Sequence, residues 1–224
     1  VIVYPSSSSQ SKTPLEMAFG RESTWDVRQT QVTAHESRGG SVCAVHLDAY
    51  SFEGEMVEGT AIGYDASFKT RNVTTVHGAG VINPAGVHFL ERFAEAMAAG
   101  NMTVISDGSH GYDQQQPQYM RPFLTEYRAL PIVGMSPVEA GADPVAVWQG
   151  AGDDGKMVFY VVNRLDQPVA AELRFKGAAA PMRLSTKEKM KLEGGLLKLA
   201  LQPYELLSFE GGPADARILE VKAV

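Results

Sequence analysis

Two carboxylates stand where an apolar stretch of the sequence ends. Residues 41–46 (SVCAVH) predict a buried strand, Asp48 follows closely, and Glu53 comes five residues after Asp48. Carboxylates in such a place can act as a general acid and a general base. Because Phe52 adjoins Glu53, its ring can desolvate that carboxyl group and raise its pKa, as a general acid requires. The alternative is an acidic loop without catalytic function.

Polar and aromatic residues also follow two other predicted strands, residues 15–19 and 102–105. The carboxyl ends of parallel strands meet at one edge of a sheet, so these loops are expected to share a cleft with Asp48 and Glu53. The sequence thus predicts Asp48 and Glu53 as the catalytic residues. The residues predicted to bind substrate are Glu22, Trp25, His46, Tyr50, Asp107, His110 and Tyr112.

The elements that must position these residues alternate between strand and helix in the first part of the chain. A helix is predicted from Asn83-Pro84 to Gly100, and Pro122 is expected to interrupt or restart another, at 117–129. Residues 51–82 are interpreted as one long connection. This alternation predicts an α/β fold with a parallel sheet, either a barrel or an open doubly wound sheet. The predicted strands are residues 1–4, 15–19, 41–47 and 102–105, and the predicted helices are residues 24–37, 83–100 and 117–129.

Short β-runs separated by turn sequences dominate the remainder of the chain. Their spacing predicts a small antiparallel β-sandwich over residues 142–224, after a boundary rich in Pro and Gly at 131–142. Alternating strand positions place four side chains in its core, Phe159, Val161, Leu173 and Leu207. The predicted strands are residues 144–148, 157–163, 170–175, 182–184, 196–201, 205–209 and 216–224.

Two segments carry a resemblance to a known family. MVFYVVNRLDQPVAAELRF (157–175) and LKLALQPYELLSFE (197–210) are similar to the β-domain appended to many (β/α)8-barrel glycoside hydrolases. The elements before them resemble the last strands and helices of such a barrel. The resemblance implies a partial (β/α) barrel over residues 1–135 and a β-sandwich domain over residues 142–224. It also implies hydrolysis of glycosidic bonds in an oligo- or polysaccharide by paired carboxylates, without a cofactor or a metal ion.

Two features depart from the family's pattern. The chain contains no Asn-Glu pair, the usual mark of the family's acid/base. The strand at 41–47, which the resemblance makes the seventh strand of the barrel, ends in His46-Leu47-Asp48 instead of a Glu. We therefore expect the chain to be part of a longer polypeptide and to be inactive on glycosides by itself. Two alternatives remain open. One is a metal-dependent hydrolase with ligands from His46, Asp48 and Asp107, and the other is a non-catalytic carbohydrate-binding or structural module.

Composition narrows the classes of partner. The formal net charge of −6 argues against binding to nucleic acid or to an anionic membrane surface. The sequence contains no apolar run of about 18 residues, the length that a membrane-spanning helix needs. A single cysteine, Cys43, allows neither an internal disulfide nor a zinc cluster of cysteines. The partner that the resemblance implies, an oligo- or polysaccharide, is compatible with this composition.

Overall fold

The structure is a computed structural model of the 224-residue chain. It describes residues 18–20, 41–47, 73–78, 86–107, 117–138, 143–177, 180–213 and 215–223. For residues 18–20, 41–47, 73–78, 89, 92 and 104–107 the description is that of the backbone. The predicted strand at residues 1–4 and the predicted helix at residues 24–37 lie outside the described residues.

A four-stranded mixed sheet forms in the first part of the chain, with the strand order β1-β4-β2-β3. β2 pairs in parallel with both β3 and β4, as expected for an α/β sheet, whereas β1 pairs antiparallel with β4. The strands are β1 (Ala18–Gly20), β2 (Ser41–Leu47), β3 (Val73–Gly78) and β4 (Met102–Asp107).

Two predictions for this sheet are wrong. The strand predicted at 15–19 is expected to run parallel to its neighbours, but β1 runs opposite to β4. The stretch 51–82, predicted as one connection, contains β3. Its sequence VTTVHG has no apolar run, and its place in the sheet comes from backbone pairing with β2, which begins at Val42↔Val73 and ends at Leu47↔Gly78. Pairing between distant segments leaves no periodic signal in either one.

Two neighbouring helices stand before and after β4 in the chain. A 3-10 turn, η2 (Gly86–Leu90), leads into α2 (Glu91–Ala99), and α3 (Pro117–Ala129) has the predicted bounds. The periodic apolar residues of the predicted helix 83–100 form one face of α2, on which Phe93, Ala94 and Met97 are fully buried. The interruption predicted at Pro122 is wrong, since α3 continues through it. Pro122 is exposed and lies early in the helix, so its cost is limited to one missing N–H donor and crowding near the first turn.

Two antiparallel sheets make up the rest of the chain, one with five strands in the order β5-β6-β7-β11-β9 and one with three in the order β10-β8-β12. Every predicted β-run is a strand, and β5 is one that the sequence did not predict. The strands are β5 (Met135–Pro137), β6 (Val145–Ala151), β7 (Lys156–Asn163), β8 (Val169–Lys176), β9 (Met182–Arg183), β10 (Leu196–Leu201), β11 (Leu206–Pro213) and β12 (Arg217–Ala223).

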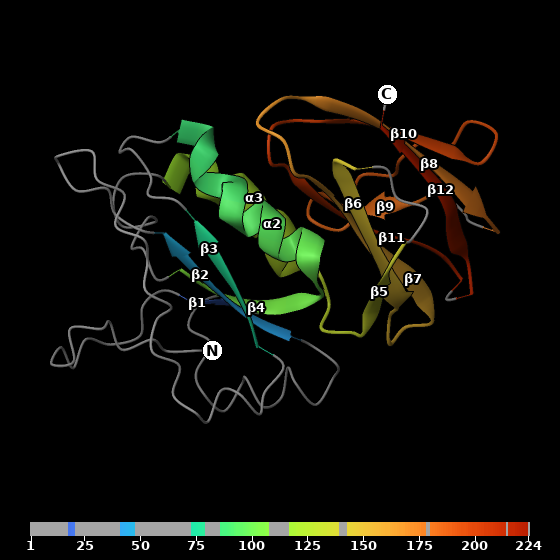
Figure 1. Ribbon diagram of the computed structural model, residues 1–224. Coiled ribbons are helices and arrows are strands. Elements are labelled where there is room, and N and C mark those ends of the chain that lie inside the picture. Colours follow the sequence, from blue (N-terminus) through green and yellow to red (C-terminus); the bar gives the residue numbers. More distant parts are fainter. Residues whose placement is uncertain are drawn as a thin grey trace, which may run out of the picture.

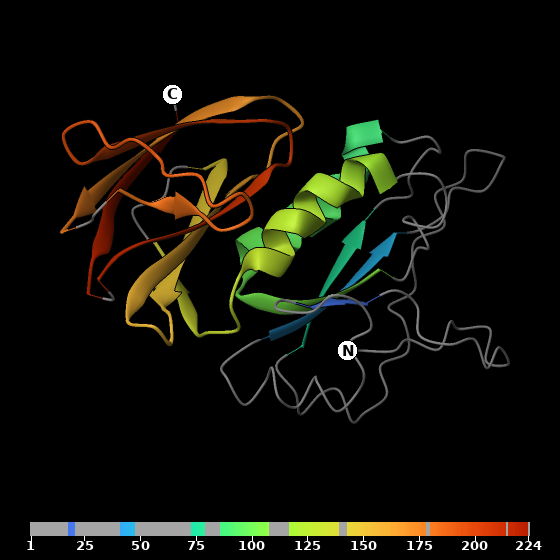
Figure 2. The same cartoon turned by 180° about the vertical axis from the view of Figure 1, so that it is seen from behind.

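The strand β7 is buried on both faces, which explains why its sequence is a continuous apolar run. One face packs with the three-stranded sheet and the other with α2 and α3, so the helices lie between the mixed sheet and the five-stranded sheet (Figures 1 and 2). The first face comprises Met157, Phe159 and Val161, and the second comprises Val158, Tyr160 and Val162.

The four core residues predicted for the β-part, which is residues 142–224, are buried as expected. Phe159, Val161 and Leu173 are fully buried and Leu207 is 5% exposed. All four belong to one apolar cluster that also includes residues of β6, β10 and β12. The stacked rings of Phe159 and Phe209, with centroids 5.0 Å apart, lie within this cluster. The two antiparallel sheets therefore share one core.

The carboxyl end of α2 is joined to the five-stranded sheet by side-chain hydrogen bonds. The hydroxyl of buried Tyr160 lies 2.9 Å from the carbonyl oxygens of both Met97 and Gly100, and its hydrogen is shared between them. The indole Nε1 of Trp148 donates to the carbonyl of Ala98 at 3.2 Å. The last carbonyl groups of a helix have no hydrogen-bond donor within the helix. Here two side chains of the five-stranded sheet supply donors to them.

We expect Tyr160→Phe to lower the free energy of unfolding by about 1–3 kcal/mol. The substitution keeps the ring and removes the donor that the Met97 and Gly100 carbonyl oxygens share, of which the Gly100 oxygen still accepts from the Met102 N–H at 2.8 Å. Urea unfolding followed by circular dichroism measures the change. The matched control is Tyr119→Phe, whose half-buried hydroxyl has no hydrogen bond within the described part of the chain and should cost under about 0.5 kcal/mol. Equal losses in the two variants would contradict this account.

Candidate functional site

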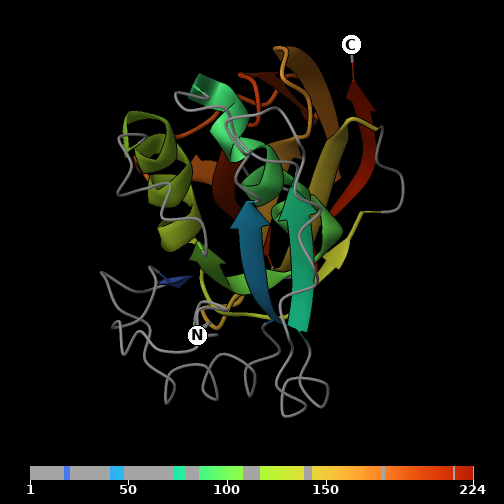
Figure 3. The same ribbon diagram turned by 60° about the vertical axis from the view of Figure 1, so that its left-hand side comes forward.

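The strands β2, β3 and β4 end at one edge of the mixed sheet. Leu47, the last residue of β2, pairs with Gly78, the last of β3, and Asp107, the last of β4, pairs with Val45. Figure 3 shows the arrowheads of β2 and β3 pointing the same way. Asp48 comes directly after Leu47 in the sequence. We call this feature the strand-end edge, defined by Leu47, Gly78 and Asp107.

The strand order places a switch point at this edge. From β2 the chain proceeds to β3 on one side, and then returns to β4 on the other side of β2. In an open α/β sheet, ligands bind in the crevice outside the carboxyl ends of two strands related in this way. In a closed barrel each strand pairs with the next one along the chain, so β4 would pair with β3. The order of the described strands is therefore that of an open sheet and not that of a closed barrel.

Two of the predicted site residues belong to strands that meet this edge. His46 pairs with His77 of β3, and Asp107 ends β4. The prediction that all the loops share one edge is wrong for β1, because Gly20 pairs with Val104 and the strand runs away from the edge. The other predicted site residues lie outside the described residues, and they are Glu22, Trp25, Asp48, Tyr50, Glu53, His110 and Tyr112.

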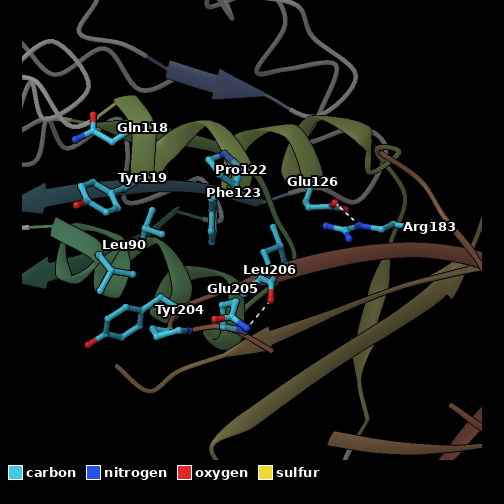
Figure 4. A pocket seen from close by; sticks show the side chains of 13 residues that line it. Leu90, Gln118, Tyr119, Pro122, Phe123, Glu126, Arg183, Tyr204, Glu205 and Leu206 are labelled. Atoms are coloured by element: carbon cyan, nitrogen blue, oxygen red, sulfur yellow. Dashed lines mark hydrogen bonds and ion pairs between the residues drawn. The ribbon is translucent and has the colours of Figure 1, made fainter. Parts of the chain in front are cut away.

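A second feature of the molecule is a cavity of about 230 Å³ on the side of α3 that faces the β-part. Its walls come from η2, α3, β9 and the turn 202–206, and the described residues that line it include none from the mixed sheet. We call it the helix–turn pocket. Figure 4 shows Pro122 and Phe123 on one side and Tyr204 and Glu205 on the other, with Arg183 at one end.

Glu126 forms a saturated hydrogen-bond network beside this pocket. The residue is 3% exposed. One of its carboxylate oxygens accepts from the Nε of Arg183 at 2.6 Å and from the Ser185 hydroxyl. The other accepts from the Ser208 hydroxyl at 2.6 Å and the Ser208 backbone N–H at 3.1 Å. These bonds joining α3 to β9 and β11 make Glu126 a structural acceptor.

Glu205 is the other carboxylate of the pocket. Burial raises its pKa above the ordinary value for a glutamate. The backbone N–H of Gln202 donates to it at 2.7 Å and opposes the shift, as does the charge of Arg183, whereas Glu126 reinforces it. A half-buried carboxyl group with this balance holds its proton to a higher pH than an exposed glutamate does.

We expect Glu205→Gln to change how stability depends on pH. Because the folded state raises the pKa of Glu205, the stability that its proton contributes is present below the unfolded-state pKa and is lost as the pH rises through the folded-state pKa. The Tm of the variant minus that of the wild type should therefore be more positive at about pH 7 than at about pH 4. Thermal unfolding at both pH values measures it, with the exposed Glu188→Gln as the control. An unchanged or more negative difference at the higher pH would contradict the shift.

Sequence analysis did not single out Glu126, Arg183 or Glu205. Glu126 lies on a helix and Arg183 in a two-residue strand, 57 positions later in the chain. No local pattern in the sequence joins two residues so far apart. One signal was available in the sequence. Glu126 is placed among the apolar residues of α3 that form its buried face, which indicates a buried carboxylate. The segment QPYE, which ends in Glu205, entered only as part of a family resemblance.

Metal ligands and membrane spans are not found in the described residues. Among them, no three His, Cys, Asp or Glu side chains lie close enough together to hold a metal ion. None of the helices that the structure describes is long and apolar enough to cross a membrane.

Comparison with known proteins gives weak structural similarities. No family model matches the sequence, and no curated protein matches it. A family 30, subfamily 8 xylanase from Clostridium acetobutylicum is 15% identical, with a TM-score of 0.40, over 69% of this chain and 46% of the xylanase. A GH27 β-L-arabinopyranosidase from Geobacillus stearothermophilus is 14% identical, with a TM-score of 0.40, over 55% of this chain and 30% of that enzyme.

A candidate alpha-galactosidase/melibiase from Bacteroides fragilis is similar at 20% identity, with a TM-score of 0.40, over 58% of this chain. This chain spans 29% of the length of that protein. All three neighbours carry the names of glycoside hydrolases. At these TM-scores the similarities assign neither a fold nor an activity to the chain.

Proposed function

We propose that the chain belongs to a glycoside hydrolase and that its strand-end edge carries part of the active site. In this proposal Asp48 and Glu53 are the catalytic residues, and His46 and Asp107 hold the saccharide. Residues 1–135 form the α/β part, whose described strands have the order of an open sheet and not of the barrel that the sequence resemblance implies, and residues 142–224 form the β-sandwich. The substrate is an oligo- or polysaccharide.

One observation carries the proposal. The strands β2 and β4 pair in parallel, and their carboxyl ends meet at the switch point. The first of these loops starts with Asp48, and β4 itself ends in Asp107. Active residues stand at the carboxyl ends of strands both in barrels and in open doubly wound sheets, so the proposal does not depend on which form the sheet takes.

The direction of β1 limits the list of contributing residues. Because β1 runs away from the strand-end edge, strand direction gives no support for Glu22 and Trp25 at this site. The proposed substrate-binding residues are therefore those of the loops after β2 and β4, namely Tyr50, His110 and Tyr112 together with His46 and Asp107.

A non-catalytic carbohydrate-binding module is the second candidate. The absence of an Asn-Glu pair from the sequence favours it, because that pair usually supplies the acid/base of the family that the sequence resembles. Such a module would bind a saccharide at the same edge without cleaving it. Turnover is therefore the property that separates the two functions.

A substrate screen tests the proposal. The longest natural form of the polypeptide is incubated with a panel of nitrophenyl glycosides and with polysaccharides, and release of nitrophenol or reducing sugar is followed. Turnover of at least one substrate, unchanged by a chelator, is the expected result. Retention on a polysaccharide column without turnover would replace the proposal with the binding module. Activity that a chelator abolishes and Zn²⁺ restores would indicate the metal-dependent hydrolase instead.

A further inference from the structure

The helix–turn pocket combines access to solvent with a partly apolar interior. Gln118, Pro122 and Gln202 are exposed at its rim, whereas Phe123 and Tyr204 are buried in its walls. A volume of about 230 Å³ falls below the range of roughly 300–1,000 Å³ that is typical of sites for drug-sized ligands. The space therefore suits a molecule of about one ring.

Tyr204 is held in the pocket wall by an unusual backbone conformation. Its φ of 54° lies in the left-handed region, which costs energy for a residue other than glycine. The turn maintains it through hydrogen bonds from the Tyr204 N–H to the Leu165 carbonyl at 3.0 Å and from the Glu205 N–H to the Gln202 carbonyl at 3.1 Å. The same turn brings Gln202, Tyr204 and Glu205 to the pocket together.

The polar groups of the pocket keep unused hydrogen-bonding capacity. Arg183 uses Nε for Glu126, and its two terminal nitrogens have no hydrogen bond within the described residues. Glu205 uses one carboxylate oxygen for the Gln202 N–H, and the same part of the chain supplies no donor to the other. The side-chain amides of Gln118 and Gln202 are likewise unpaired with any described group. Donors and acceptors are thus both available around one small space.

The charges of the pocket select against an anion. The positive charge of Arg183 is matched by its ion pair with buried Glu126, and Glu205 adds a second carboxyl group. The favoured ligand is uncharged, carries several hydroxyl groups and has an apolar face that packs on proline and aromatic side chains. A pyranose ring has this combination, because its hydroxyl groups lie around the edge and its C–H groups line the faces.

The geometry points to a binding site for a single pyranose unit in the helix–turn pocket, separate from the strand-end edge. Gln118, Gln202, Arg183 and Glu205 bind its hydroxyl groups, and Pro122 and Tyr204 contact its faces. This inference rests on the pocket alone and not on the proposed hydrolysis. At about −0.3 kcal/mol for each non-hydrogen atom of a small ligand, a methyl pyranoside is expected to bind with a dissociation constant on the order of millimolar.

Ligand-observed NMR titration tests the site with methyl α-D-glucopyranoside and methyl β-D-galactopyranoside as probes. The full chain should bind at least one of them saturably. The exposed double variant Gln118→Ala/Gln202→Ala should weaken that binding at least about tenfold, the effect of losing roughly 1.4 kcal/mol. Gln202→Trp, which places an indole at the rim, should abolish it. Gln167→Ala, an exposed glutamine of another turn, is the matched control and should bind as the wild type does.

A separate variant distinguishes this site from the proposed active site. Asp48→Asn changes the strand-end edge only, so it should leave the titration with the pyranosides unchanged. Binding that is lost in Asp48→Asn but kept in the glutamine variants would overturn the pocket and place the sugar at the strand-end edge. The pocket would also be overturned if neither probe bound to the full chain. Thermal unfolding of each variant confirms that it is folded, and a failed substrate screen has no bearing on these results.

Discussion

Replacing Asp48 with asparagine is expected to lower kcat on the best substrate of the screen by about 100- to 10,000-fold, the range for loss of a general acid or base. Asparagine has nearly the same size but can neither take up nor release a proton. Glu53→Gln should have an effect of similar size. Because both residues follow the end of β2 in the sequence and are predicted to lie in a loop, the Tm should change little. Initial rates of glycoside hydrolysis and thermal unfolding measure the two quantities.

The control for this prediction is Glu58→Gln, an acid of the same segment that we interpret as solvated. Its rate should stay within about twofold of the wild type. If Asp48→Asn and Glu53→Gln both retained the full rate, the acidic segment after β2 would be an ordinary loop. The catalytic carboxylates would then have to come from elsewhere in the polypeptide.

Removal of the Glu126 carboxylate is expected to have the largest effect on stability. Glu126→Ala deprives the Arg183 guanidinium, two serine hydroxyls and one backbone N–H of their acceptor. Breaking a fully buried ion pair by removing one partner costs about 3–5 kcal/mol, and the loss here is expected near the lower end because the Arg183 side chain is 28% exposed. For a chain of this size the Tm should fall by roughly 10 °C. Chemical and thermal unfolding of the variant measure the loss.

Two further variants sharpen this test. Glu126→Gln keeps one acceptor oxygen and should be intermediate, because it loses the charge and the second pair of bonds. Glu188→Ala removes an exposed glutamate and should cost under about 0.5 kcal/mol. A loss of less than about 1 kcal/mol in Glu126→Ala would show that the network contributes little beyond packing.

Much of the fold could be predicted because apolar patterning marks it locally. The run MVFYVV in β7 indicates a strand buried on both faces, and α3 begins and ends at the residues that its sequence predicts. The spacing of turns located the strands of both antiparallel sheets. Short strands with weak patterns, β3 and β5, could not be found in this way because neighbouring strands hold them through the backbone.

The arrangement of strands and the second site could not be predicted from the sequence. The antiparallel direction of β1 depends on its pairing with β4, more than 80 residues later in the chain. The pocket is likewise assembled from Glu126, Arg183 and Glu205, which come from separate elements. An acidic residue in an amphipathic helix usually faces solvent, and only the tertiary structure shows that Glu126 does not.

The distance between carboxylates at the strand-end edge is the most direct test of the proposed active site. An experimental structure of the longest natural form of the polypeptide would place Asp48 and Glu53, which follow β2, and Asp107, which ends β4. Our account predicts that Asp48 and Glu53 face one cleft with their carboxyl groups about 5–10 Å apart, the separation that glycoside hydrolysis uses, and that Asp107 borders that cleft. Carboxyl groups of Asp48 and Glu53 that point outward into solvent, well beyond that separation and away from Asp107, would contradict it.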